Sequence, residues 1–77
     1  MKKLINLIEE CNNMIYTEKD FHNEADLVYN YFIDTEMFTY EELNLVTNIN
    51  GYNLETLNDC LFSRFGYRDL EQMLSEW

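Results

Sequence analysis

The chain of 77 residues contains no proline, two glycines, two cysteines and one histidine. Without proline, helices can be joined by short polar turns that contain no rigid break. The two cysteines, Cys11 and Cys60, lack the density of a secreted disulfide scaffold and the spacing of a zinc site. Because both fall on apolar faces of the sequence pattern, we expect buried free thiols.

Long apolar runs are also missing. No stretch approaches the roughly 18 residues that span a membrane, so no membrane partner is expected. The opening Met-Lys-Lys-Leu-Ile is typical of a signal peptide, but Glu9 and Glu10 interrupt the apolar stretch that should follow. We therefore expect a cytoplasmic protein.

A single histidine, His22, leaves little basis for enzyme chemistry. One histidine cannot supply both a general base and a metal site. Carboxylates are plentiful, but their abundance does not identify a catalytic pair. An EF-hand counted from Asp34 fails, because Phe38 and Thr39 would occupy a ligand position and the glycine position. The sequence therefore predicts no enzyme activity, no cofactor and no metal site.

Positive charge is scarce, because five Lys and Arg stand against fifteen Asp and Glu, for a net charge of −10. Seven of these ten units lie in one third of the chain, where Lys19 is the only base among eight acids: Glu18, Asp20, Glu24, Asp26, Asp34, Glu36, Glu41 and Glu42. Helix dipoles favour acids in first turns and explain the position of about half of all the acids. They do not explain an excess of one sign, which indicates solubility, steering or recognition of a basic surface.

Apolar spacing predicts helices along almost the whole chain. A first helix is expected at residues 2–15, with an inner stripe of Leu4, Leu7, Ile8, Cys11 and Ile15. A second helix should begin at either Thr17 or Asn23 as its N-cap. Its inner stripe contains Phe21, Ala25, Val28, Tyr29 and Phe32.

The second half of the sequence carries clearer start and stop signals. Thr39 to Glu42 form a capping box, and Asn50-Gly51 should end that helix, whose inner residues are Leu43, Val46 and Ile49. Asn53 should cap a fourth helix that stops at Gly66, with Leu57, Cys60, Leu61 and Phe65 inward. A last short helix within residues 67–77 buries Leu70, Met73, Leu74 and Trp77. The prediction is one all-α domain over residues 1–77, a small bundle of four to five short helices.

One alternative stays open at Asn50-Gly51. Asn-Gly is also the strongest short hairpin signal, and residues 45–49 and 52–56 alternate passably between apolar and polar. An α+β fold with a β-hairpin here therefore competes with the helical interpretation. The capping box at Thr39 and the periodic stretch after Asn53 favour helices.

Two helices joined at Asn50-Gly51 also have the outline of a helix-turn-helix. A recognition helix lies beside phosphates and needs basic residues. The helix after Asn53 instead carries Glu55 and Asp59 against Arg64. No direct binding of nucleic acid is expected.

Two arginines are expected to serve the fold. Arg64 lies in the last turn before Gly66, where the helix dipole favours a cation. Arg68 lies three residues before Glu71, which is a helical pairing distance.

The acidity can be compared with that of DNA. A compact domain of this length has a radius of gyration near 11–12 Å and a diameter of about 30 Å. Duplex DNA of that length carries about 18 phosphate charges. Ten net charges biased to one region therefore approach what one face of a duplex presents, so the surface could compete for a groove built for nucleic acid.

The candidate partner-binding residues follow from this comparison. Asp34, Glu36, Glu41 and Glu42 lie within nine residues around a predicted helix–helix junction and should contact Lys or Arg of a basic protein surface. Glu18, Asp20, Glu24 and Asp26 extend the acidic segment. Tyr31, Tyr40 and Tyr52 fall off the predicted inner stripes, and Tyr31 and Tyr40 flank the acids as candidate anchors.

The small size, strong acidity, many Asn and Tyr and helical pattern resemble anti-defence proteins of phages and mobile elements, including anti-CRISPR inhibitors and DNA mimics. Residues 41–52 and 64–71 are similar to segments of small phage proteins from low-GC Gram-positive hosts. The resemblance concerns overall character and includes no family motif. It implies stoichiometric inhibition of a host nucleic-acid enzyme, with an RNA-guided nuclease as one candidate.

Two other functions remain open from the sequence. The chain can be a small helical adaptor or regulator that binds a protein through its helices, with the acids serving solubility and association rate. It can also be a subunit of a homo-oligomer with a structural role.

Overall fold

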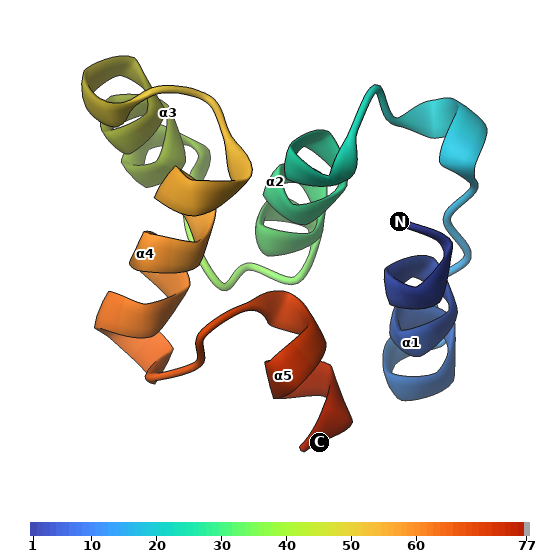
Figure 1. Cartoon of the computed structure of the whole chain (residues 1–77). Coiled ribbons are helices and arrows are strands. Elements are labelled where there is room, and N and C mark those ends of the chain that lie inside the picture. The colour runs from blue at the N-terminus through green and yellow to red at the C-terminus, as the bar shows by residue number, and fades with distance from the viewer. Residues whose placement is uncertain (77) are drawn as a thin grey trace.

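Residues 1–76, which the computed structural model describes, form five α-helices and one short 3-10 turn. In chain order they are α1 (Lys2–Asn12), η1 (Glu18–Asp20), α2 (Glu24–Asp34), α3 (Tyr40–Asn50), α4 (Leu54–Phe65) and α5 (Leu70–Ser75). No strand occurs among residues 1–76, so the all-α prediction is confirmed and the hairpin alternative at Asn50-Gly51 is wrong. Figure 1 shows α2 at the centre, with α3 and α4 on one side and α1 on the other.

Polar side chains fix the start of four helices. Asn23, Thr39, Asn53 and Asp69 each accept a hydrogen bond from the backbone N–H three residues further on, at 2.8 to 3.1 Å. Each bond satisfies one of the N–H groups that a first helical turn leaves unpaired. The predicted caps at Asn23, Thr39 and Asn53 are confirmed, whereas Thr17 precedes only η1.

The first helix ends earlier than the prediction of residues 2–15. Asn13 adopts the left-handed conformation at φ 58°, and its N–H donates to the Glu9 carbonyl at 2.9 Å. Asparagine tolerates this conformation better than most residues, so it can end a helix as glycine does. Ile15 follows this end and is 79% exposed. The apolar spacing continues to Ile15 and therefore predicts a longer helix. It does not detect the C-cap at Asn13, where the helix ends.

The third and fourth helices end as predicted, at Gly51 and Gly66. Their φ angles are 105° and 83°, which glycine adopts without a steric cost because it has no Cβ. A Cβ at Gly51 would lie 2.9 Å from Nδ2 of Asn53, the residue that caps α4. The tight turn between α3 and α4 therefore needs both the glycine and the cap.

The second helix ends in a Schellman motif. The Met37 N–H donates to the Phe32 carbonyl at 3.0 Å, and the Glu36 N–H donates to the Ile33 carbonyl at 3.1 Å. Glu36 occupies the left-handed position of this motif, at φ 60°. The chain thereby turns sharply toward α3.

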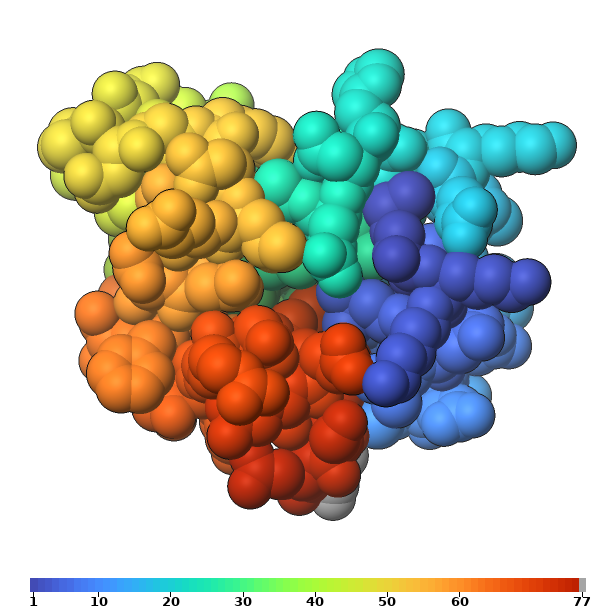
Figure 2. All heavy atoms as spheres, viewed as in Figure 1, coloured from blue at the N-terminus to red at the C-terminus, as the bar shows by residue number. Residues whose placement is uncertain are grey.

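One hydrophobic core joins all five helices. The radius of gyration of the Cα atoms is 11.7 Å, inside the range expected from the chain length. Helix α1 packs against α5, and α4 packs against both α2 and α3. Figure 2 shows α3 and α4 (yellow to orange) forming one side of the molecule and α1 (blue) the other. The buried apolar residues are Leu4, Ile5, Ile8, Ala25, Leu27, Val28, Tyr31, Phe32, Phe38, Leu43, Leu57, Leu61, Leu70, Met73 and Leu74.

Helix α3 buries less than its apolar pattern predicts. Leu43 is fully buried and Val46 half-buried, but Ile49 is 72% exposed, so its predicted inward position is wrong. Thr47 takes the next buried position toward α4, and its hydroxyl donates to the Leu43 carbonyl at 2.8 Å. Because α3 packs mainly on one neighbour, only a narrow strip of its surface reaches the core.

Other inward positions also differ. Phe65 is 43% exposed at the end of α4, although its ring contacts Phe38 edge-on at 5.8 Å between centroids. Phe21 precedes α2 and packs on Tyr16 at 5.2 Å instead of lying within the helix. The prediction for Trp77 lies outside the described residues. No helix in the described part of the chain has the length and apolar character needed to cross a membrane.

Tyr31 is the largest correction, because it is 1% exposed and therefore lies in the core instead of on a partner-binding surface. Its hydroxyl donates to Oδ1 of Asn12 at 2.8 Å, which ties α2 to the end of α1. Helix α2 is central and therefore buries more than one face. Tyr31 lies on a buried face outside the predicted inner stripe. Tyr29, expected in the core, is only half-buried.

We expect Tyr31→Phe to lower the free energy of unfolding by about 1 kcal/mol, because the Asn12 side chain loses its buried donor while the ring remains. Urea denaturation followed by circular dichroism measures the change. Tyr40→Phe is the matched control, since Tyr40 is 62% exposed and its change should stay within about 0.5 kcal/mol. Equal effects of the two substitutions would contradict the structural role of the Tyr31 hydroxyl.

Candidate functional site

The eight acids of residues 18–42 form two groups at opposite ends of α2. The amino-terminal acids are Glu18, Asp20, Glu24 and Asp26, and the junction acids are Asp34, Glu36, Glu41 and Glu42. Figure 1 shows η1 leading into the start of α2, and the α2–α3 connection leaving its other end. Since each helical residue rises 1.5 Å, the two ends of α2 lie about 15 Å apart.

Ion pairs leave most of this segment uncompensated. The structure contains three between residues of 1–76: Lys3–Glu71 at 2.8 Å, Arg68–Asp69 at 3.4 Å, and Arg64–Glu42. The predicted pairing of Arg68 with Glu71 is therefore wrong, because Glu71 joins α5 to α1 through Lys3 instead. Of the eight acids only Glu42 has a cationic partner, so seven carboxylates within the described residues carry uncompensated charge.

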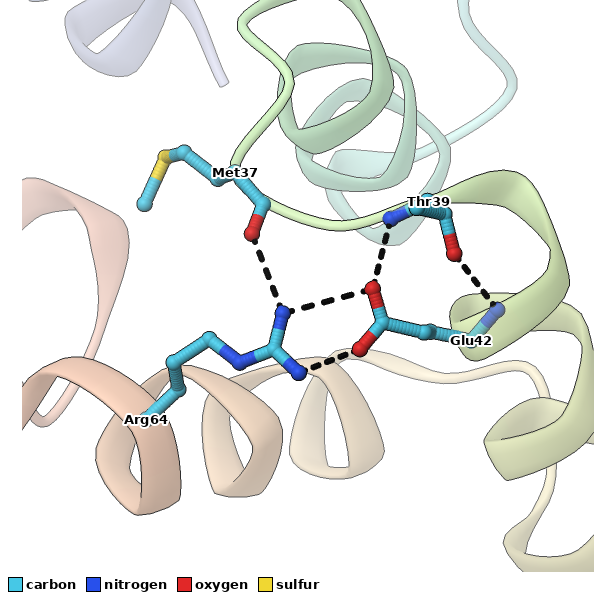
Figure 3. Close-up of polar contacts among 4 residues, drawn as sticks. All are labelled: Met37, Thr39, Glu42 and Arg64. Carbon is cyan, nitrogen blue, oxygen red and sulfur yellow. Dashed lines mark hydrogen bonds and ion pairs between the residues drawn. The ribbon is translucent and has the colours of Figure 1, made fainter.

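Glu42 has a structural position at the start of α3, which Figure 3 shows. Its Oε1 accepts the Thr39 N–H at 3.0 Å, which completes the predicted capping box. The Arg64 guanidinium reaches from α4 to both carboxylate oxygens and also donates to the Met37 carbonyl at 3.3 Å. This arginine thus joins α4 to the α2–α3 connection, in addition to lying in the last turn of its helix as predicted.

Arg64 and the cap explain the electrostatics of Glu42. The hydrogen bonds from Arg64, then the one from the Thr39 backbone, lower the pKa of the Glu42 carboxyl to about 2. Glu42 therefore stays ionised, and Arg64 already compensates its charge. Asp34, Glu36 and Glu41 remain the junction acids without a cation.

These three acids are all exposed. Asp34 accepts a hydrogen bond from the Tyr16 hydroxyl at 2.6 Å, which holds one carboxylate oxygen in place. Glu36 lies at the left-handed turn, and Glu41 lies in the first turn of α3. Together they place three carboxylates around the α2–α3 connection.

The amino-terminal acids differ in how firmly they are held. Asp26 accepts hydrogen bonds from the His22 N–H at 3.2 Å, the Asn30 side chain at 3.2 Å and the Tyr52 hydroxyl at 2.9 Å. It therefore ties α2 to the turn between α3 and α4. Asp20 accepts a hydrogen bond from the Thr17 hydroxyl at 2.8 Å. None of the four amino-terminal acids, including Glu18 and Glu24, has a cationic partner among residues 1–76.

A tyrosine cluster lies on the surface of α2. Tyr29 contacts Tyr40 edge-on at 6.3 Å and Tyr52 at 5.2 Å between ring centroids. Tyr40 is 62% and Tyr52 50% exposed, which confirms the expectation that both lie off the inner stripes. Because Tyr29 lies halfway along α2, the cluster is placed between the helix ends that carry the two groups of acids.

The sequence did not reveal a groove of about 690 Å³ between α3 and α4. Phe38, Leu43, Val46 and Cys60 supply its apolar lining, and Glu55 lies on its α4 wall. A groove depends on the distance between two helices, which periodicity does not encode. The signal in the sequence that could have indicated a groove is the number of apolar residues on α3, which is larger than one neighbouring helix can bury.

No group of three or more His, Cys, Asp or Glu within residues 1–76 is arranged to hold a metal ion. No protein-family model, curated protein or solved structure matches this chain. The features that bear on function are thus the uncompensated acids, the exposed tyrosines and the α3–α4 groove.

We expect Glu42→Ala to lower the melting temperature more than Glu42→Gln, because glutamine at this position retains the cap and loses only the ion pair. A carboxyl with a lowered pKa stabilises the fold above its usual pKa near 4.5 and loses that effect as pH falls to about 2. The advantage of the wild type over Glu42→Gln should therefore be full at about pH 7 and mostly lost at about pH 2. Thermal melts followed by circular dichroism measure it.

Glu41→Gln is the matched control, since Glu41 is an adjacent exposed acid with no cationic partner among residues 1–76. Its melting temperature should follow that of the wild type across the same pH range. A Glu42→Gln deficit as large at about pH 2 as at about pH 7 would show that the ion pair is not its cause.

Tyr16 and Tyr52 are among the tyrosines that should ionise late. Burial first, and then a hydrogen bond to a carboxylate, raise the pKa of Tyr16 and Tyr52 well above the usual value of 10. Since the folded state keeps these protons, it should lose stability as pH rises above about 10. Absorbance titration at 295 nm should show that some phenolates form only well above pH 10. The number of these late-ionising tyrosines should fall by one in Tyr16→Phe and by one in Tyr52→Phe. Ionisation of all six tyrosines near pH 10 in the folded protein would contradict this expectation.

Proposed function

We propose that this protein is an acidic inhibitor that binds the basic nucleic-acid-binding surface of a host defence or DNA-processing protein. The observation that carries the proposal is the set of seven carboxylates in residues 18–42 without a cationic partner within residues 1–76. Such a one-sign surface repels itself until a basic surface covers it. The same charge speeds association with that surface.

The dimensions of the molecule support mimicry of a nucleic acid. Its longest extent is 32 Å, and duplex DNA of that length carries about 19 phosphate charges. A net charge of −10 is about half of this number, as expected for one face of a duplex. The two ends of α2, which carry the two groups of acids, lie about 15 Å apart. That separation is of the same order as the roughly 12 Å width of the major groove.

Each part of the surface has a proposed role. Asp34, Glu36 and Glu41 contact Lys or Arg of the target, while the exposed rings of Tyr40 and Tyr52 supply rigid contact area. An RNA-guided nuclease of the CRISPR class is one candidate target, because it holds nucleic acid in a basic channel and reads a short motif with arginines. Inhibition by occupation of that channel would be stoichiometric.

A helical adaptor that does not imitate nucleic acid is the second candidate function. The α3–α4 groove favours it, since a groove between two helices can hold a segment of a partner.

The test uses the triple variant Asp34→Asn, Glu36→Gln, Glu41→Gln, which removes three charges with little change of shape. Targets are first captured on the wild-type protein from a nuclease-treated lysate of a low-GC Gram-positive bacterium and eluted with duplex DNA. We expect the triple variant to bind the eluted protein more than tenfold more weakly, mainly through slower association. Added salt should weaken the wild-type complex as well.

The control is the triple variant Glu9→Gln, Glu10→Gln, Glu76→Gln, which removes the same charge at exposed positions outside the acidic segment. It should reduce affinity less than twofold. Equal losses in the two variants would indicate attraction by net charge alone. Failure of duplex DNA to release any bound protein would contradict mimicry.

A further inference from the structure

The groove between α3 and α4 is a second surface, distinct from the uncompensated junction acids. The groove extends from Asn53, the N-cap of α4, to Arg64 in its last turn, which is about 16 Å or three helical turns. Its volume of about 690 Å³ is large enough for several side chains of a partner.

Apolar groups form part of the groove lining, beside polar residues such as Asn50, Thr56 and Ser63, and continue beyond its edge. Phe38 and Leu43 are buried beneath it, and Val46 and Cys60 are half-buried within it. On α3, Leu45 and Ile49 precede and follow the groove residue Val46 by one and three positions, and they are 62% and 72% exposed. An apolar strip therefore extends from the groove onto the outer surface of α3.

The free charge of the groove is negative. Glu55 and Asp59 lie one helical turn apart on the α4 wall, both are exposed, and neither has a cationic partner within residues 1–76. Like charges at this spacing repel each other. Arg64, the cation that lines the groove, is engaged by Glu42. The groove thus combines a mixed polar and apolar lining with two carboxylates that lack a counterion within residues 1–76.

We propose that the α3–α4 groove binds a basic amphipathic helix of a partner protein. Apolar residues on one face of that helix contact Val46, Cys60 and the Leu45–Ile49 strip, and flanking Lys or Arg side chains pair with Glu55 and Asp59. A helix of about three turns matches the length of the groove, and an amphipathic helix laid into a groove is a recurring mode of peptide recognition. The charge of the groove excludes a second copy of this chain as the preferred occupant, because each copy carries a net charge of −10.

This inference does not depend on nucleic-acid mimicry, because it concerns Glu55 and Asp59 instead of Asp34, Glu36 and Glu41. The two proposals can therefore fail separately. If both hold, the protein contacts one partner at two surfaces or two partners at once.

The probe is a synthetic 15-residue peptide of Leu and Lys with Leu at helical spacing on one face. Its control is the same composition in an order that disperses the leucines, so that net charge is unchanged and the apolar face is lost. We expect the amphipathic peptide to bind at least tenfold more tightly by isothermal titration calorimetry. Equal affinity of the two peptides would show attraction by charge alone and would overturn the proposal.

Charge-removing variants locate the binding site. Glu55→Gln with Asp59→Asn should weaken binding of the amphipathic peptide at least fivefold. The matched pair Glu9→Gln with Glu10→Gln lies on α1, removes the same charge and should change affinity less than twofold. Equal effects of the two pairs would place the peptide elsewhere and overturn the proposal.

The two cysteines provide a readout on the wild-type protein that does not rely on any variant. Cys60 lines the groove, whereas Cys11 lies on α1 and its thiol donates to the Leu74 carbonyl at 3.5 Å. The amphipathic peptide should slow alkylation of Cys60 at least tenfold and leave the rate at Cys11 unchanged, as measured by mass spectrometry of proteolytic fragments. Unchanged alkylation of Cys60 in the presence of bound peptide would overturn the proposal. Protection of Cys60 that grows with protein concentration, without any peptide, would indicate a second copy in the groove and would also overturn it.

Discussion

The burial of α2 on more than one side is the constraint on which the rest of the structure depends. A chain of this size buries only about 60% of its unfolded surface, so its helices must share one thin core. Leu27, Val28, Tyr31 and Phe32 are each at most 1% exposed and fill that core from a single helix. Because charged groups are costly to bury, the acids of this region are confined to the ends of α2 and to its connections. The separation of the acidic surface into two groups follows from this packing.

Two of the five cations join separate elements of the fold, and the surface stays largely negative. Lys3 joins α1 to α5 through Glu71, and Arg64 joins α4 to the start of α3 through Glu42. Arg64 also lies 4.7 Å above the ring of Phe38, beside the groove. Exposed pairs of this kind add little stability individually, but they fix how neighbouring elements meet. With these cations engaged, Asp34, Glu36, Glu41, Glu55 and Asp59 are not neutralised from within residues 1–76.

Features that depend on a few neighbouring residues could be predicted from the sequence. The caps at Asn23, Thr39 and Asn53 and the stops at Gly51 and Gly66 result from local hydrogen bonding and backbone freedom. Tertiary contacts decided the rest. Tyr31 is buried because α2 is surrounded, Ile49 is exposed because α3 has one main neighbour, and the α3–α4 groove arises from the spacing of two helices. The excess of acid on residues 18–42 was evident from composition, but the separation of Glu42 from the other junction acids required the position of Arg64.

Glu36 has a consequence for how this sequence balances folding against charge. It occupies the left-handed position of the Schellman motif at the end of α2, where glycine or asparagine is the usual residue. A residue with a Cβ costs roughly 1 kcal/mol more than glycine in this conformation. Replacement by glycine would relax the backbone and at the same time remove one carboxylate from the junction. At this position local stability and negative charge oppose each other. Selection for stability alone would favour glycine, whereas selection for a negative surface would favour glutamate.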